Sequence, residues 1–251
     1  MTAQATIHTS IVDRDFAEKF LQAVDAPMRY PVYVLFHEWW DQAPQSAIDA
    51  YLAETLKEEG AREALQEKYI GEPLTLAQLE ACAPGTLGHA YRRFLLDSKL
   101  EENLGKNYRQ FYEEMNNSGA LDRLPPELGY MVVRAFQVHD FLHVLTGFNS
   151  SPQGELALSA FYLAQLRYPY NAMRMAVTMS HMAFVNPALI TDAMDAIVDG
   201  WLLGRSASNL NFARWEEEID TPLEALRTRM QLTQHRPPLG ASERPAWVLP
   251  Y

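Results

Sequence analysis

The chain has 251 residues, 48% of them hydrophobic, and carries a formal net charge of −11 at pH 7. This length and composition suffice for one large domain with a substantial core. The negative charge argues against binding to nucleic acid and gives little attraction to anionic lipids, so any membrane contact would rely on apolar side chains. The single cysteine, Cys82, excludes an intramolecular disulfide and favours a reducing compartment.

The N-terminal residues have neither the basic start and apolar stretch of a secretory signal nor the arginine-rich composition of a transit peptide. We expect residues 1–12 to be a flexible N-terminus, and we expect a cytoplasmic protein of a bacterium. The longest stretch without Asp, Glu, Lys or Arg runs from Met175 to Thr191 and contains His181 and Pro187. It is too short and too polar to cross a bilayer, which needs roughly 20 mostly apolar residues.

The first half of the chain is typical of short helices. Residues 13–27 alternate acidic and apolar positions and predict a helix that ends before Pro27. The aromatic segment 30–40 fits either a strand or a buried helix, because periodicity does not separate the two over so short a run. Further helices are expected over 46–69, with or without a break at Gly60, over 75–85, and over 86–100.

Stronger helical patterns follow Pro125 and Pro126. The first runs from Glu127 to Leu145, and the second starts at Pro152 with Ser151 as its N-cap. Helices are also expected over 171–184, 187–207 and 220–230, the last of them capped by Asp220 or Thr221. The sequence therefore predicts a mainly α fold, a single-domain multi-helix bundle over 13–232, followed by a proline-rich tail over 233–251.

One segment, HDFLHVLTGFNSSPQGE (139–155), concentrates ligand groups. His139 and His143 are four residues apart, which places both imidazoles on one face of a helix, and Asp140 lies about 100° round from His139. Glu155 follows a turn rich in Gly, Asn and Ser and falls in the first turn of the next helix, where the helix dipole favours a carboxylate. Two antiparallel helices can bring these groups together, which predicts a metal site between consecutive helices.

Imidazole and carboxylate ligands without cysteine suit zinc, iron(II) or manganese, and the paired imidazoles favour zinc. Asp140 has two interpretations. It either ligates the ion, or it stays beside the ion as a proton acceptor or histidine orienter and leaves one coordination position for chemistry. The competing explanation is a chance pairing of two structural histidines in the core.

The same segment resembles the HDxxH(x11)E signature of the ubiquinone (coenzyme Q) biosynthesis family founded by the fourth Coq protein. Eleven residues, Val144 to Gly154, separate His143 from Glu155, so the spacing matches. Other blocks resemble the family in the same order: PGTLGHAYRRFL (84–95), LGYMVVRAFQVHD (128–140), Gln165 with Pro169, and RWEEEIDTPLEALRTRM (214–230). The resemblance spans roughly residues 84–230.

Four positions near the signature depart from the family pattern. Phe136 and Gln137 stand where the family has Arg-Glu, and Ser159 and Tyr162 stand where it has Lys and Glu. Because these charges are lost near the site, a diverged paralogue stays open as an alternative, and the substrate and activity need not be identical to those of the family.

The resemblance implies that His139, Asp140, His143 and Glu155 bind Zn²⁺. The ligand types leave Fe²⁺ or Mn²⁺ as other candidates, and Asp140 is the candidate catalytic residue. It implies a ubiquinone biosynthesis protein that acts on or organises polyprenylated benzoquinone precursors, with oxidative decarboxylation at C1 of the ring as the candidate reaction. Other quinone-biosynthesis proteins are the expected partners, and a peripheral position on the inner membrane is the expected location. A homodimer is left open. The alternative is a non-catalytic prenyl-lipid-binding scaffold for the biosynthetic complex, with a structural metal.

Arg92 and Arg134 are the candidate substrate-binding residues, because a guanidinium can hold a carboxylate or phosphate through two hydrogen bonds. Arg134 lies about 140° round the helix from His139 and therefore points to another face. A salt bridge at the surface or between helices is the simpler explanation for both arginines.

Overall fold

Side-chain caps set the starts of the N-terminal helices. In the computed structural model, which describes residues 13–27, 43–58, 60–117 and 125–232, Asp13 caps α1 (Arg14–Asp25) by accepting a hydrogen bond from the backbone N–H of Phe16. Thr75 and Gln78 form a capping box on α5 (Leu76–Ala81), and Thr86 caps α6 (Leu87–Ser98). The predicted helices are confirmed in these three places. Residues 1–12, 30–40 and 233–251 lie outside the described part of the chain.

The other helices follow the predicted order with one addition. The break at Gly60 divides α3 (Gln45–Thr55) from α4 (Ala61–Glu67). The added helix is α7 (Tyr108–Asn117), which the sequence analysis did not predict and which has no fully buried residue. The remaining helices are α8 (Pro126–Thr146), α9 (Pro152–Leu166), α10 (Pro169–Val185), α11 (Ile190–Ser206) and α12 (Leu223–Arg229).

The predicted cap of α12 is wrong. Pro222 is the N-cap residue, and neither Asp220 nor Thr221 makes a side-chain cap hydrogen bond to this helix. The segment before α12 pairs with the start of α6 instead: the backbone N–H of Leu87 donates to the carbonyl of Thr221 at 2.9 Å. The Thr221 hydroxyl donates to Glu218 at 2.6 Å.

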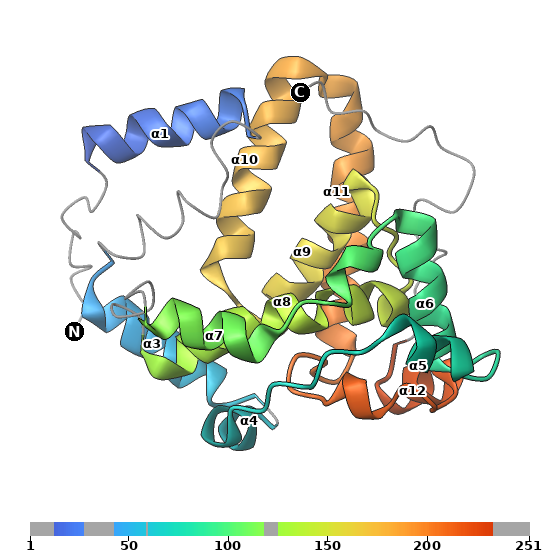
Figure 1. The fold of residues 1–251 in the computed structure, drawn as a ribbon. Coiled ribbons are helices and arrows are strands. Elements are labelled where there is room, and N and C mark those ends of the chain that lie inside the picture. Colours follow the sequence, from blue (N-terminus) through green and yellow to red (C-terminus); the bar gives the residue numbers. More distant parts are fainter. Residues whose placement is uncertain (1–12, 28–42, 59, 118–124, 233–251) are drawn as a thin grey trace.

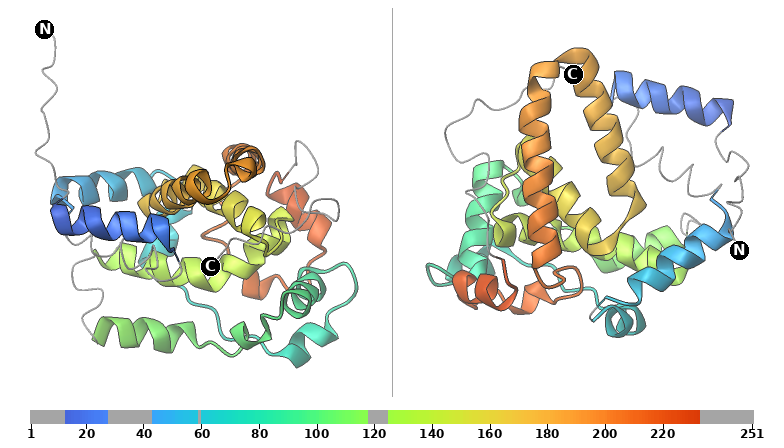
Figure 2. Two further views of the ribbon diagram at one scale, coloured as in Figure 1. Left: turned by 90° about the horizontal axis from the view of Figure 1, so that it is seen from above. Right: turned by 180° about the vertical axis from the view of Figure 1, so that it is seen from behind.

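The central layer consists of α8 and α9, which are buried on nearly all faces. α6, α7 and α12 pack on α8, whereas α10 and α11 pack on α9, and α1 packs against α10 (Figure 1). The view from above shows α8 and α9 between the α10–α11 pair on one side and α7 on the other (Figure 2). The described residues contain no strand, only an isolated bridge between Thr86 and Pro222. The predicted mainly α, single-domain helical bundle is confirmed.

The contact between α9 and α11 depends on a small residue. A Cβ atom added at Gly200 would lie 1.9 Å from the backbone carbonyl oxygen of Ala157, which has no freedom to move aside. We expect Gly200→Ala to lower the free energy of unfolding by about 1–3 kcal/mol through overpacking. Urea unfolding measures this, with Gly105→Ala as the control because no atom lies within 4 Å of that added Cβ. Equal stability of the two variants would contradict the tight crossing.

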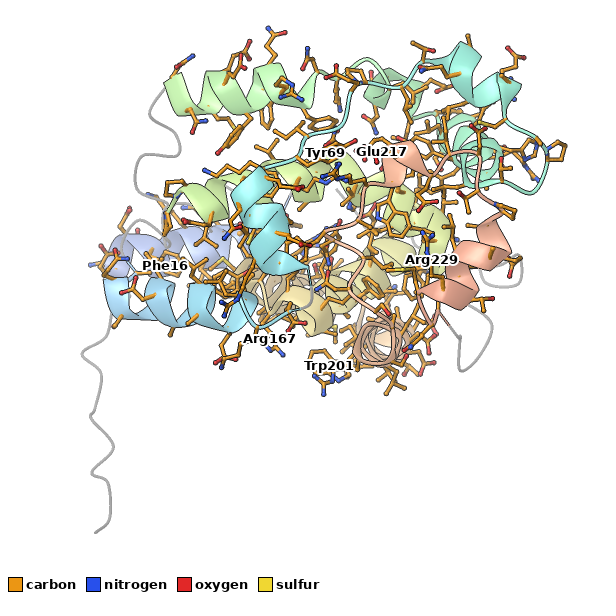
Figure 3. The ribbon with its side chains drawn as sticks, turned by 90° about the horizontal axis from the view of Figure 1, so that it is seen from below. Phe16, Tyr69, Arg167, Trp201, Glu217 and Arg229 are labelled. Atoms are coloured by element: carbon orange, nitrogen blue, oxygen red, sulfur yellow. The ribbon has the colours of Figure 1, made fainter. Side chains whose placement is uncertain are left out.

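One face of α11 is apolar and exposed. Met194, Val198, Trp201 and Leu202 recur at helical spacing and are each more than 40% exposed. Trp201 lies at the outer surface of the molecule (Figure 3). Among the helices of the described segments, none has both the length and the hydropathy to cross a membrane.

Candidate metal centre

α8 brings the two histidines of the signature together. The Nε2 atoms of His139 and His143 are 3.3 Å apart, and their rings meet edge to face with centroids 4.8 Å apart. Both imidazoles therefore present the same nitrogen to one point. This is the arrangement that the i, i+4 spacing predicts.

Neighbouring groups fix the orientation of His143. The side chain is fully buried, its ring stacks on Phe94 at a centroid distance of 5.1 Å, and its Nδ1 lies 2.9 Å from the carbonyl oxygen of Phe148. A carbonyl oxygen only accepts, so Nδ1 carries the hydrogen and donates it. In the neutral ring the Nε2 lone pair then faces the cluster, which is the tautomer that binds a metal.

The turn between the helices delivers Glu155 to the same point. Ser151 caps α9 by accepting a hydrogen bond from the N–H of Gly154, as predicted. Gly154 itself lets the turn close, because an added Cβ would lie 1.9 Å from the carbonyl oxygen of Asn149. Glu155 consequently sits in the first turn of α9, with Oε1 at 3.1 Å from Nε2 of His143 and 3.6 Å from Nε2 of His139.

The donor set fits a divalent cation. One nitrogen from each of His139 and His143 and one oxygen from Glu155 all lie within 4.8 Å of one another. The Nδ1 hydrogen of His143 is donated to Phe148, so Nε2 of a neutral His143 has no hydrogen to donate to Glu155. Unless an imidazole is charged, lone pairs of nitrogen and oxygen face one another here, as the ligands of a cation do. Two nitrogens and a carboxylate oxygen match catalytic zinc sites, which have three protein ligands and one open position.

The charge of Glu155 is secured by the same neighbours. Burial alone would raise the pKa of Glu155, but hydrogen bonds and charge from His139 and His143, when these imidazoles are protonated in the metal-free site, outweigh burial and hold the pKa far below its ordinary value. The carboxylate is thus ionised at neutral pH, as a metal ligand must be.

Asp140 stands apart from the three. Its Oδ2 accepts a hydrogen bond of 2.9 Å from the side-chain amide of Asn103, and the carboxyl group is mostly buried. Burial and the charge of Asp140 raise the pKa of Tyr108 to about 12. This geometry accords with the interpretation that Asp140 acts beside the ion, and its roles as ligand and catalytic residue stay predictions.

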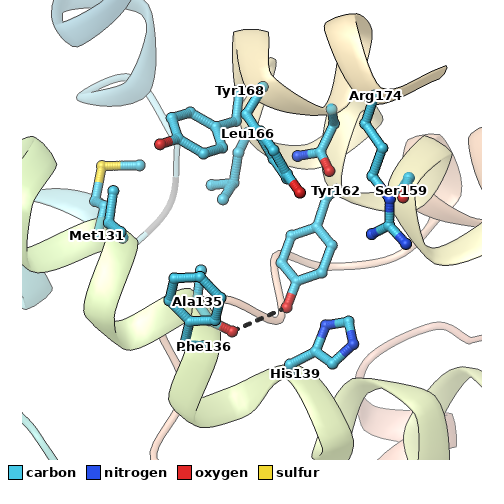
Figure 4. Close-up of a pocket in the computed structure, with 12 residues that line it drawn as sticks. Met131, Ala135, Phe136, His139, Ser159, Tyr162, Leu166, Tyr168 and Arg174 are labelled. Carbon is cyan, nitrogen blue, oxygen red and sulfur yellow. Dashed lines mark hydrogen bonds between the residues drawn. The ribbon is translucent and has the colours of Figure 1, made fainter. Parts of the chain in front are cut away.

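A cavity of about 210 Å³ opens beside His139 (Figure 4). Its wall is mostly apolar and aromatic. α8 contributes Met131, Val132, Ala135, Phe136 and His139; α9 contributes Ser159, Tyr162 and Leu166; and Tyr168, Tyr170, Asn171 and Arg174 complete it. Three of the four positions that depart from the family pattern, Phe136, Ser159 and Tyr162, therefore line one cavity. Gln137, the fourth, pairs with both backbone groups of Gly71.

The two predicted substrate-binding arginines make salt bridges and do not line this cavity. Arg134 is buried and holds both carboxylate oxygens of Glu216, at 2.5 and 3.0 Å. Arg92 lies 3.4 Å from Glu80 near the surface. Both contacts agree with the simpler explanation, a salt bridge at the surface or between helices. Substrate binding by either residue stays a prediction.

Arg174 was not predicted from the sequence as a residue of the site. Its Nη2 donates to Oε2 of Glu155 at 3.3 Å, and its side chain lines the cavity. A signal was present, because Arg174 is the single arginine or lysine between Arg167 and Arg205, in a mostly apolar helix.

Comparison with known proteins gives concordant matches. A family model described as Coenzyme Q (ubiquinone) biosynthesis protein Coq4 matches residues 42–236. The mitochondrial ubiquinone biosynthesis protein COQ4 homolog of Nematostella vectensis is 26% identical over 178 residues, which cover 68% of this chain and 77% of that protein. The mitochondrial COQ4 protein of Lachancea thermotolerans is 25% identical over 182 residues, 71% of this chain. The matched region spans about half of that fungal relative, 51% of its length.

The fold has a solved counterpart. A putative ubiquinone biosynthesis protein from Nostoc punctiforme superposes with a TM-score of 0.68 at 21% identity, over 87% of this chain and 95% of that one. At this identity the similarity establishes the arrangement of helices and leaves the chemistry to the residues of the site.

Proposed function

Because the chain belongs to the Coenzyme Q (ubiquinone) biosynthesis protein Coq4 family, we propose that it binds a divalent cation, most simply zinc, and acts on a polyprenylated ring precursor of ubiquinone. The observation that carries the proposal is the position of His139, which belongs both to the cluster with His143 and Glu155 and to the wall of the aromatic cavity. A ring held in the cavity would thus meet the cation. An apolar wall suits a prenylated compound.

The reaction proposed is oxidative decarboxylation at C1 of a polyprenylated benzoate, in which the carboxylate leaves as carbon dioxide and a hydroxyl takes its place. When bound, the cation would supply Lewis acidity toward a ring oxygen. The exchange of carboxylate for hydroxyl releases two electrons. An external oxidant such as dioxygen must accept them; iron or manganese in the site could relay the electrons to that oxidant, whereas zinc does not change oxidation state. In this proposal Asp140, held by Asn103 at 2.9 Å, is the proton acceptor beside the cation; it does not line the cavity, so the proton would reach it through a water at the cation.

Asp140→Asn tests the catalytic role in a host that lacks its own C1 step. We expect the quinone product to fall about 100-fold, the scale of a lost general base, while zinc content stays near that of the unmodified protein. The exposed Asp97→Asn on α6 is the matched control. Zinc loss in Asp140→Asn would show that Asp140 is a ligand, and normal quinone levels would remove it from the catalytic residues.

A second candidate is a non-catalytic scaffold that binds a prenyl lipid and uses the metal to hold α8 and α9 together. The apolar cavity and the bridging of two consecutive helices by the cluster favour it. Mass spectrometry of lipids that co-purify with the protein tests prenyl binding in both readings. Normal quinone synthesis by Asp140→Asn together with a bound polyprenyl compound would select the scaffold.

Peripheral contact with a membrane is proposed through the apolar face of α11, and other quinone-biosynthesis proteins are the proposed partners on that membrane. We expect Trp201→Glu to weaken binding to phosphatidylcholine vesicles about tenfold, because an apolar anchor is lost. Co-sedimentation measures this, with Leu76→Glu on α5 as the control, since Leu76 is also about 40% exposed. Undiminished binding would assign the apolar face to another purpose. A bacterial cytoplasmic location and a homodimer stay predictions.

A further inference from the structure

The carboxylate of Glu155 has two different neighbours. Oε1 faces the two histidines, at 3.1 and 3.6 Å, whereas Oε2 faces Arg174 at 3.3 Å. Glu155 therefore lies between the cation position and a guanidinium on the cavity side. Figure 4 shows Arg174 reaching from α10 toward the part of the cavity where Ser159 and His139 lie.

Arg174 is the one formally charged side chain in the cavity wall, His139 aside. The hydroxyls of Ser159 and Tyr162 are already committed, since they donate to the backbone carbonyls of Glu155 and Ala135 at 2.8 and 3.3 Å. Within the described residues, the guanidinium of Arg174 makes one hydrogen bond, to Glu155. A guanidinium has five N–H donors, so most of its donors are available to a ligand.

The charge balance of the loaded site favours an anion. A divalent cation, one ionised glutamate and one arginine leave an excess of two positive charges at the end of an apolar cavity. The Asp140 carboxylate, which does not line the cavity, lowers this excess to one. A charge in such surroundings is costly unless an opposite charge accompanies it. An anionic oxygen group placed between the cation and Arg174 would supply that partner, and the aromatic wall would hold the rest of the molecule.

We propose that Arg174 is the specificity-determining residue of this cavity and that it binds the anionic oxygen group of an otherwise apolar ligand. This assignment rests on the proposed function. The family pattern has a lysine at the position of Ser159 on α9. An acidic ligand remains compatible with Ser159 because the positively charged side chain, Arg174, comes from α10 instead.

The test compares an acid with its neutral isostere. The probes are 3-prenyl-4-hydroxybenzoate and 3-prenyl-4-hydroxybenzamide, titrated by calorimetry into the full chain with and without zinc. We expect Arg174→Gln to weaken binding of the acid about 10-fold to 100-fold and binding of the amide less than about 2-fold, because only the acid loses a charge-assisted hydrogen bond. Arg174→Lys should restore part of the loss, since it keeps the charge without the planar fork.

Arg205→Gln, an exposed arginine on α11, is the matched control and should change neither affinity. Equal weakening of acid and amide in Arg174→Gln, unchanged binding of the acid, or no binding of either probe to the unmodified protein would overturn the assignment. Zinc content of the same samples separates the two proposals. A protein that takes up no zinc refutes the metal site, whereas Arg174-dependent discrimination in the zinc-free titration still supports the anion site.

Discussion

Glu155→Gln is expected to lower the zinc affinity at least about 100-fold while the helical bundle stays folded. The amide keeps the size of the side chain but removes the negative charge that Oε1 presents to the cluster at 3.1 Å from His143. Outer-shell partners alone are worth 10- to 100-fold in metal affinity, so loss of a ligand charge should reach at least the upper end of that range. Competition with a chromophoric chelator measures the affinity directly.

A second readout separates metal loss from misfolding. At zinc concentrations about 100 times the dissociation constant, ligand binding should raise the melting temperature of the unmodified protein by roughly 5 to 10 °C. The variant should melt at the same temperature with and without zinc. Glu127→Gln, which changes a glutamate in the first turn of α8, is the matched control and should keep the zinc response. A retained zinc-dependent shift in Glu155→Gln would refute the carboxylate as a ligand.

The three converging groups could be predicted because every step between them is local. Four residues of helix set the two histidines on one face, and a turn with a serine cap and a proline fixes where the next helix starts. Glu155 then falls in the first helical turn. Such short-range geometry follows from helix periodicity and capping, so sequence and structure agree here.

The cavity and the position of Arg174 in its wall could not be predicted in the same way. Arg174 comes from a third helix, 19 residues after Glu155, and its position depends on how α10 packs against α9. Asn103, which holds Asp140, lies 37 residues before it in a short helical turn. Periodicity describes one element at a time and carries no information about such crossings.

The fold shows the same division between local and tertiary control. Helix starts with clear capping signals were predicted well, as for α9, which begins at Pro152 after the Ser151 cap. α7 was missed because its sequence is mostly polar and it packs on α8 without burying a residue fully. The cap of α12 was misassigned because pairing with the start of α6, more than 130 residues earlier, engages Thr221.

Arg134→Met is expected to lower the free energy of unfolding by about 3–5 kcal/mol, the largest loss of stability expected for a single change in this chain. Arg134 and Glu216 are almost fully buried, and the guanidinium also donates to the carbonyl of Ala213 and the side chain of Gln137, each at 2.6 Å. Methionine can fill the space, but it leaves the carboxylate of Glu216 buried without its partner. Urea unfolding followed by circular dichroism measures the change.

Two further variants decide whether the cost comes from the orphaned charge. Arg134→Met combined with Glu216→Leu removes both charges and should recover most of the stability, because a well-packed apolar pair often replaces a buried ion pair without loss. Arg229→Met breaks an exposed pair with Glu218 and should cost no more than about 1 kcal/mol. If Arg134→Met stays as stable as the unmodified protein but loses affinity for the prenylated acid, then Arg134 binds substrate and its pairing with Glu216 is incidental. If instead the double variant is stable and binds the acid normally, the guanidinium serves to join α8 to the C-terminal segment, and Arg174 alone supplies the positive side chain of the cavity.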